Sequence, residues 1–362
     1  MATDDLFLDS DIPAGDIEFT IPAASTTKEF GNVTVRKRGD IFEIQLTLLI
    51  QPPAQMPKAW KTAVALDASA SMKKAFGRFL QGQIPAHVAK EYEEKGWFKK
   101  GYRDGRRVKT FARPAVDDAI KRALVSLSPN HMDYLGPEFI TYLARQMDVD
   151  RAPTLLYWAG EDGSGIELVG DIKEPDCAAL TIEGPNEMAF GQKSFLLPAV
   201  KFLVDRVKNS HMGLFVFLTD GRIDDLPAVK EYSLALAREI VAGKREPIKC
   251  VLIGVGDEIN EAPLSELDDL TSQTYINLWD HMIVSDFQDM LKIFGELLRD
   301  AQIVASKGAL FDSSGKALRR YPNGLPSRLV FSMPITSPWF ELEIADQRIR
   351  QLVKVPKYGL GG

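Results

Sequence analysis

The sequence predicts an α/β fold, with a doubly wound, mostly parallel sheet in the centre and a small β-sandwich formed by the N- and C-terminal flanks. Three observations predict this arrangement. Apolar runs alternate with amphipathic segments of helical length between residues 58 and 304, as in sheets that are covered by helices on both faces. Two of these runs end in an aspartate, at Asp67 and at Asp220. The flanks instead alternate polar and apolar residues, a pattern typical of half-buried antiparallel strands.

The composition limits the classes of function. The chain has 362 residues, of which 45% are hydrophobic and 26% are charged, as expected for a globular protein with an α/β core and a second, smaller unit. A net charge of -6 argues against general nucleic-acid affinity, and no apolar run reaches the roughly 18 residues of a membrane span. Cys177 and Cys250 are too few for a disulfide framework, and the acidic N-terminus lacks a signal-peptide pattern. We therefore expect a cytoplasmic protein that does not contact membranes.

The two flanks are predicted to be rich in strands. Residues 1–15 are expected to be disordered, and the N-terminal flank, 16–57, ends in a proline-rich linker. The C-terminal flank, 305–357, precedes a flexible Gly-rich tail at 358–362. Neither flank has enough strands to bury a core alone, so we expect both to build one β-sandwich, with the central domain inserted between them. The expected strands are 17–21, 33–37, 42–48, 309–311, 328–332 and 339–344.

The central domain, 58–304, is predicted from the alternation of strand and helix patterns. Its expected strands lie near 62–67, 153–159, 165–170, 213–219, 249–255 and 274–278. Its expected helices lie near 72–94, 115–128, 135–149, 194–208, 226–242 and 284–304. In an open α/β sheet, ligands bind beyond the carboxyl ends of the strands, so we expect a functional site at that edge.

The first candidate site residues follow the strand expected near 62–67. Asp67, Ser69 and Ser71 form a DxSxS pattern, which places one carboxylate and two hydroxyls at alternate positions. Hard oxygen ligands with few charges suit Mg²⁺, which accepts about one or two carboxylates and keeps water at its other positions. The pattern is short, and it also fits a serine-rich helix N-cap.

Two further segments are expected at the same edge of the sheet. The apolar run 214–218 leads into a Thr-Asp-Gly sequence at Asp220. The segment 191–200 is a loop that runs into an amphipathic helix and contains Ser194. Because the carboxyl ends of parallel strands meet at one edge, the expected fold would bring Asp67 and Asp220 together.

This order of motifs resembles the von Willebrand factor A (vWA) family, whose fold is Rossmann-like and whose metal-ion-dependent adhesion site binds partners through a divalent cation. The resemblance covers roughly residues 58 to 304. It implies that Asp67, Ser69 and Ser71 are cation ligands and that Asp220 is a second acid, which reaches the ion through water. It places Ser194 at the position of the family's threonine. The implied cofactor is Mg²⁺, with Mn²⁺ or Ca²⁺ as alternatives.

A narrower resemblance concerns the bacterial tellurium-resistance-associated subset of this family. The segment 250–256, the acidic residues within 267–270 and the amphipathic helix expected near 284–304 are similar to that subset. The resemblance implies an adaptor role in a bacterial stress-response or defence assembly.

Two residues depart from the family's pattern. Ser194 keeps the hydroxyl of the usual threonine but lacks the methyl group that restricts its rotamer. Lys193, next to it, would compete electrostatically with a cation. Both departures bear on the expected metal affinity and not on the expected fold.

A basic and aromatic insertion interrupts the central domain at about residues 90–113. Between residues 95 and 113 the sequence has eight basic residues and one acid, with aromatic residues interleaved. Such a segment can bind nucleic acid, dock an acidic partner protein, or be a solvated excursion whose aromatics pack back on the domain. The residues expected to bind a partner here are Trp97, Lys99, Lys100, Arg103, Arg106 and Arg107.

The sequence therefore predicts a metal-dependent protein-binding module that is not an enzyme. The four histidines show no metal-ligand or catalytic spacing, and Ser69 and Ser71 have no evident base. Mg²⁺ would bridge to an Asp or Glu of a partner protein, for which a AAA+ ATPase is one candidate. Two alternatives stay open: a nucleic-acid-associated factor that uses the insertion at 95–113, and a non-catalytic subunit of a AAA+ machine of the chelatase or MoxR type.

Overall fold

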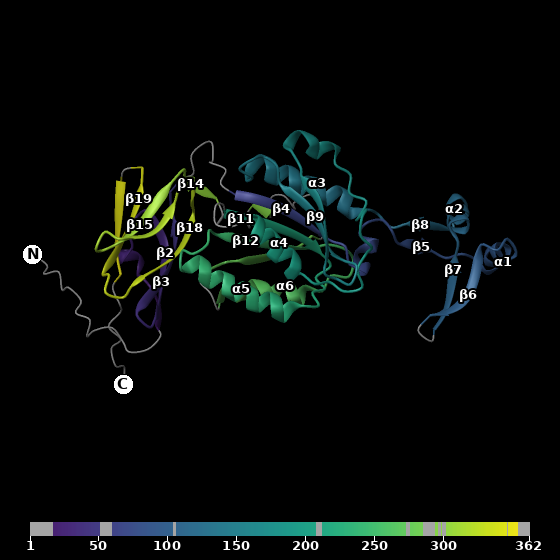
Figure 1. Cartoon of the computed structure of the whole chain (residues 1–362), viewed down its shortest axis with the longest axis horizontal. Coiled ribbons are helices and arrows are strands. Elements are labelled where there is room, and N and C mark those ends of the chain that lie inside the picture. The colour runs from purple at the N-terminus through teal and green to yellow at the C-terminus, as the bar shows by residue number, and fades with distance from the viewer. Residues whose placement is uncertain are drawn as a thin grey trace, which may run out of the picture.

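The computed structural model describes residues 17–50, 60–103, 106–207, 212–272, 276–284, 294–295, 298, 302–345 and 347–353. The described parts lie along one long axis (Figure 1). Two flanking sheets lie at one end, a six-stranded sheet with its helices lies in the middle, and a slender arm projects from the other end.

The six-stranded sheet has the strand order β10-β9-β4-β11-β12-β13. All neighbouring pairs are parallel except β10 with β9, which is antiparallel. The strands are β4 (Trp60–Asp67), β9 (Thr154–Gly160), β10 (Gly165–Asp171), β11 (Met212–Thr219), β12 (Ile248–Gly254) and β13 (Trp279–Ile283). Strands β4, β9, β11 and β12 are buried almost throughout, because apolar side chains on both of their faces are covered.

Helices cover both faces of this sheet (Figure 1). Helix α3 (His131–Gln146) packs on the face that includes Val64 and Leu66. Helices α4 (Leu197–Val207), α5 (Leu226–Val241) and α6 (Glu261–Asp268) pack on the opposite face, which includes Ala65 and Phe217. Alternate residues of each strand point to opposite faces, so the two faces have separate cores.

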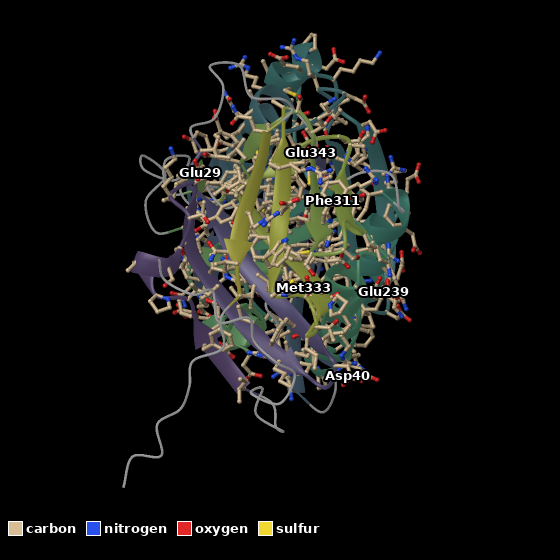
Figure 2. The ribbon with its side chains drawn as sticks, turned by 90° about the vertical axis from the view of Figure 1, so that its left-hand side faces the viewer. Glu29, Asp40, Glu239, Phe311, Met333 and Glu343 are labelled. Carbon is tan, nitrogen blue, oxygen red and sulfur yellow. The ribbon has the colours of Figure 1, made fainter. Side chains whose placement is uncertain are left out.

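The two flanking sheets are antiparallel and share one core. One has the order β1-β2-β3-β18 and the other the order β16-β15-β19-β20. Leu46 pairs with Leu329 across β3 and β18, so strands from opposite ends of the chain are neighbours. Figure 2 shows the purple N-terminal strands beside the yellow C-terminal strands, with Phe311 and Glu343 on the latter. The bounds are β1 (Ile17–Thr20), β2 (Phe30–Arg38), β3 (Ile41–Leu48), β15 (Gly308–Asp312), β16 (Ala317–Tyr321), β18 (Arg328–Pro334), β19 (Trp339–Ile344) and β20 (Gln347–Leu352).

The predicted fold class is wrong. The described residues form a mixed α/β fold: the six-stranded sheet is mixed, because β10 runs antiparallel to β9, and it stands among several smaller antiparallel sheets. A doubly wound, mostly parallel sheet therefore does not describe the fold class. The physical reason is the length of the connections. Only residues 161–164 separate β9 from β10, whereas a parallel crossover needs about a dozen residues or more.

Two predicted helices are also wrong in part. The helix expected near 72–94 is replaced by a short 3-10 helix, η3 (Ala70–Lys74), a strand, β5 (Leu80–Gly82), and helix α1 (Ala86–Glu94). Gly77 and Gly82 have positive φ angles of 69° and 106°, which continuous helix does not allow. The helix expected near 115–128 ends at Lys121 as α2 (Arg113–Lys121), before strand β8 (Val125–Leu127).

Two other expectations concern the end of the central domain. The strand expected near 274–278 lies at Trp279–Ile283. The helix expected near 284–304 falls mostly outside the described residues, as do the segments 1–15 and 358–362.

The arm is larger than the predicted insertion. Strands β5 and β8 form a two-stranded neck, and α1, α2 and the hairpin of β6 (Phe98–Arg103) and β7 (Arg106–Phe111) lie beyond it (Figure 1). These elements share a small core of their own, which includes Val88, Tyr92 and Phe98. Among the described residues, no helix combines the length and apolar character that a bilayer crossing requires.

A buried arginine joins the flanking sheets to the six-stranded sheet's helices. Arg319, on β16, is 7% exposed. Its guanidinium donates to the carbonyl oxygens of Ile240 at 2.5 Å and Arg245 at 2.9 Å, at the end of α5 and just after it. A cation is favourable at a helix C-terminus, where carbonyl groups lack partners within the helix.

Replacing Arg319 with methionine is expected to lower the free energy of unfolding by about 2 kcal/mol, because buried carbonyl groups lose a charged donor. Urea unfolding followed by circular dichroism measures this. The matched control is Arg320→Met at the next residue, which is exposed and should lose only about 0.5 kcal/mol. Equal losses in the two variants would contradict the assigned role of Arg319.

Candidate functional site

Asp67 is the centre of the candidate site. It ends β4, and its side chain is fully buried. One carboxylate oxygen, Oδ1, accepts a hydrogen bond from the backbone N–H of Ser69 at 2.8 Å. The other, Oδ2, accepts from the hydroxyl of Thr219 at 2.7 Å and from the hydroxyl of Ser194 at 3.3 Å. The acid is therefore held by donors from three separate segments.

The two serines of the DxSxS pattern lie next to each other. The Oγ atoms of Ser69 and Ser71 are 3.1 Å apart. Ser69 is buried and Ser71 is exposed, so this pair extends from Asp67 towards the surface. Ser69 is the N-cap residue of η3, but its side chain makes no capping hydrogen bond. Its hydroxyl is therefore not used as a helix cap, which was the alternative interpretation of the pattern.

The loop that carries Ser194 is fixed against the loop that follows β11. The backbone N–H of Ser194 donates to Oδ2 of Asp224 at 2.7 Å, and the N–H of Asp224 donates to the carbonyl of Ser194 at 2.8 Å. The carboxylate of Asp225 accepts from the N–H groups of Leu196 and Leu197 at 2.8 and 2.9 Å. These bonds satisfy donors at the start of α4, which otherwise lack partners.

The same loop is also fixed against the DxSxS segment. Gly191 donates to the carbonyl of Ala68 at 2.9 Å and accepts from the N–H of Ala70 at 2.6 Å. A Cβ atom at Gly191 would lie 2.0 Å from the carbonyl oxygen of Ala159. Only glycine fits this close approach of two backbones.

Asp220 lies at the same edge of the sheet and is half-buried. Its Oδ1 accepts from the backbone N–H of Arg222 at 3.0 Å, and its charge acts on Asp67. The next residue, Gly221, has a φ of +84°, and a Cβ atom there would lie 2.1 Å from the carbonyl oxygen of Asn260. Glycine is therefore required for the chain to turn after Asp220.

The electrostatic environment of Asp67 is unfavourable for its charge. Burial raises the pKa of Asp67 from 3.8 to about 7, and the negative charge of Asp220 adds to the rise, while hydrogen bonds from Thr219 and Ser69 oppose it. A nearby divalent cation would favour the ionised carboxylate and reverse this effect. The structure thus places a desolvated acid beside a second acid and several hydroxyl oxygens.

The five candidate residues, Asp67, Ser69, Ser71, Ser194 and Asp220, offer oxygen atoms of the kind that binds divalent cations. Carboxylate and hydroxyl oxygens are the hard ligands that Mg²⁺, Mn²⁺ and Ca²⁺ prefer, and three of the five candidates are serines. In the part of the chain that the structure describes, no group of three or more His, Cys, Asp or Glu side chains is arranged to hold a metal. The candidate set contains only two carboxylates, Asp67 and Asp220.

Lys193 has a contact of its own. Its side chain is exposed, and its Nζ lies 5.4 Å from the centre of the Phe195 ring. A cation at this distance from an aromatic face is attracted to it. The ammonium group therefore has a partner other than Asp67.

Thr219 contacts Asp67 but was not among the site residues predicted from the sequence. It is fully buried, and its hydroxyl also accepts from the N–H of Gly221 at 3.1 Å while donating to Asp67. The signal was present, since a hydroxyl directly precedes Asp220 at the end of an apolar strand. The positioning role of Asp224 and Asp225 had no such signal, because it depends on where two loops meet.

The basic residues of the insertion are not brought to Asp67. Hairpin β6–β7 lies in the arm, far from the carboxyl end of β4 (Figure 1). Lys99 and Lys100 are exposed, and Lys100 forms an ion pair with Glu93 at 2.8 Å. Trp97 is half-buried, and its ring centre lies 6.0 Å from that of Tyr92. The side chains of Arg103, Arg106 and Arg107 lie outside the described part of the structure.

Comparisons with known proteins give no match. No protein-family model matches this chain, and no curated protein matches its sequence.

The pKa of Asp67 predicts a pH-dependent difference between the wild type and Asp67→Asn in cation-free buffer. Because the folded-state pKa, about 7, is above the ordinary value of 3.8, the stability that this carboxyl contributes is fully present below about pH 4 and is lost as the pH rises through about 7. Relative to the wild type, Asp67→Asn should therefore gain about 3 to 4 kcal/mol of unfolding free energy between pH 4 and pH 8.

Denaturant unfolding in EDTA at both pH values measures this difference, in which the titration of all other groups largely cancels. Thr219→Val, which removes one donor to Asp67 without removing the acid, should keep the pH dependence. Parallel stability profiles for the wild type and Asp67→Asn would contradict the assigned burial of a charged group.

Proposed function

We propose that this protein is a cation-dependent protein-binding module, in the manner of the metal-ion-dependent adhesion site of vWA proteins. The observation that carries the proposal is the convergence of Asp67, Ser69, Ser71, Ser194 and Asp220 at one edge of a sheet. Ser69 and Ser194 donate hydrogen bonds to Asp67, Ser71 lies beside Ser69, and the charge of Asp220 helps to raise the pKa of Asp67 to about 7. A site of this kind is costly for a protein unless a positive charge occupies it.

Each of these residues would have a different role in binding the cation and the partner. Asp67 supplies the buried negative charge, and Ser69 and Ser71 supply neutral oxygens on the path from Asp67 to the surface. Asp220 and Ser194 orient the surrounding ligands and water. A bound Mg²⁺, or Mn²⁺ or Ca²⁺, would supply the residual positive charge that attracts a carboxylate. Because Ser71 is exposed, an Asp or Glu side chain of a partner protein can reach this position.

The proposal includes no catalytic step. Ser194 and Thr219 donate their hydroxyl hydrogens to Asp67 and are fully buried, so neither is placed to attack a substrate. We further propose a cytoplasmic setting, which the two buried free thiols of Cys177 and Cys250 favour. An adaptor role in a stress-response or defence assembly, with a AAA+ ATPase as one candidate partner, rests on the sequence resemblance alone.

Cation binding is the first test of this proposal. The wild type is expected to bind Mn²⁺ in solution, with Mg²⁺ as a competitor, as measured by electron paramagnetic resonance of free Mn²⁺. Asp67→Ala and Ser71→Ala should each weaken binding by about tenfold or more, because each removes an oxygen ligand. Ser126→Ala, at an exposed serine of β8, is the matched control and should bind like the wild type. Mn²⁺ binding that is unchanged in Asp67→Ala would overturn the site.

Partner capture is the second test. Proteins that co-purify with the chain in Mg²⁺ should be released by EDTA, and Asp67→Ala should not recover them, because the bridging cation is lost. The fold of Asp67→Ala should stay intact, as judged by circular dichroism. Equal recovery of the same partner in Mg²⁺ and in EDTA would contradict a cation bridge.

A further inference from the structure

A hollow opens beside the candidate cation site. It has a volume of about 750 Å³, and both Ser71 and Asp220 line it. Its other walls come from η3, from the base of the arm, from the residues before and at the start of α3, and from the loop after β12. A hollow of this size accommodates several side chains of a bound segment.

Phe79 forms an apolar wall of this hollow. It lies at the base of the arm, directly before β5, and is 53% exposed. The neck places side chains on two different faces. Leu80 pairs directly with Leu127 across β5 and β8, so these two share one face of the neck, while Phe79 and Gln81 alternate with Leu80 and line the hollow.

Hydrogen bonds hold Phe79 in place relative to Ser71. The hydroxyl of Ser128 donates to the carbonyl of Lys74 at 2.7 Å and accepts from the N–H of Phe79 at 3.3 Å. The N–H of Ser128 donates in turn to the carbonyl of Phe79 at 2.7 Å. Lys74 is the last residue of η3, which also contains Ser71. A single buried serine thus connects the apolar wall to the helix that carries a cation ligand.

The charges that line the hollow are balanced. Lys74 and Asp257 form an ion pair with each other. The basic side chains on the walls, apart from His131, equal the acidic ones in number: Lys73, Lys74 and Arg222 against Asp220, Asp257 and Glu258. With Asp67 ionised and a divalent cation bound, the net charge of the hollow and the site together becomes positive, which favours an acidic group.

We propose that the partner binds here through an extended protein segment that carries one acidic side chain and, close to it in sequence, one large apolar side chain. The acid lies at the Ser71 and Asp220 end of the hollow, and the apolar side chain packs on Phe79. This inference rests on the proposed function, and it adds a second point of recognition that selects among acidic partners.

Synthetic peptides test it directly. Each probe is an 11-residue Gly/Ser peptide with a central Glu, and with Leu or Phe at one position from one to four residues on either side. Binding to the full chain is measured by fluorescence anisotropy in Mn²⁺ and in EDTA, against the parent peptide that has only Glu. At least one peptide that carries both Glu and an apolar residue should bind about tenfold more tightly than this parent, because an apolar side chain is removed from water.

Two matched variants locate the apolar contact. Phe79→Ser should remove the tenfold gain, whereas Leu127→Ser, at a residue 54% exposed on the other face of the neck, should keep it. Both variants should bind Mn²⁺ like the wild type, which separates this inference from the cation site. The inference is overturned if no peptide gains over the parent, or if Phe79→Ser keeps the gain. A wild type that binds no Mn²⁺ would instead overturn the proposed function.

Discussion

The hydrogen bond from Thr219 to Asp67 connects the ends of two neighbouring parallel strands, and the candidate site depends on it. Leu66 and Leu218 are register partners in β4 and β11. The residues that follow them, Asp67 and Thr219, therefore lie side by side. Two residues that are 152 positions apart in sequence therefore come within 2.7 Å. The parallel pairing of β4 and β11 brings the two residues close together, and their short polar side chains form the hydrogen bond.

Burial of Asp67 makes its negative charge unfavourable. The carboxylate accepts hydrogen bonds from Ser69, Ser194 and Thr219, yet its pKa is still raised to about 7. Neutral donors thus offset only part of the cost of placing a charge away from water and next to Asp220. This imbalance is the reason why we propose a cation at the site, since a purely structural acid is normally balanced by a basic side chain or by a full set of donors.

The base of the arm and the candidate site share the same short segments. Residue Ser71 lies in η3, and the chain passes from there to Phe79 and into the neck of the arm. Strand β8 returns from the arm to Ser128, whose hydroxyl donates a hydrogen bond to the carbonyl of Lys74. An insertion at this place does not disturb the six-stranded sheet, because its two ends are close together and are tied by hydrogen bonds. It does add new surface beside the candidate site, because Phe79 and Gln81 line the same hollow as Ser71 and Asp220.

The sequence alone determined the positions where buried strands end in polar residues, because an apolar run followed by Asp67 or Asp220 is a local pattern that reports burial. It also indicated three helices of the central region, His131–Gln146, Leu197–Val207 and Leu226–Val241, from their amphipathic period. Sheet direction at β10, the break of the expected helix at Gly77 and Gly82, and the hydrogen bond from Thr219 to Asp67 were decided only by the tertiary structure. These features depend on contacts between distant segments and on the length of the turns that join them, and local periodicity carries no information about either.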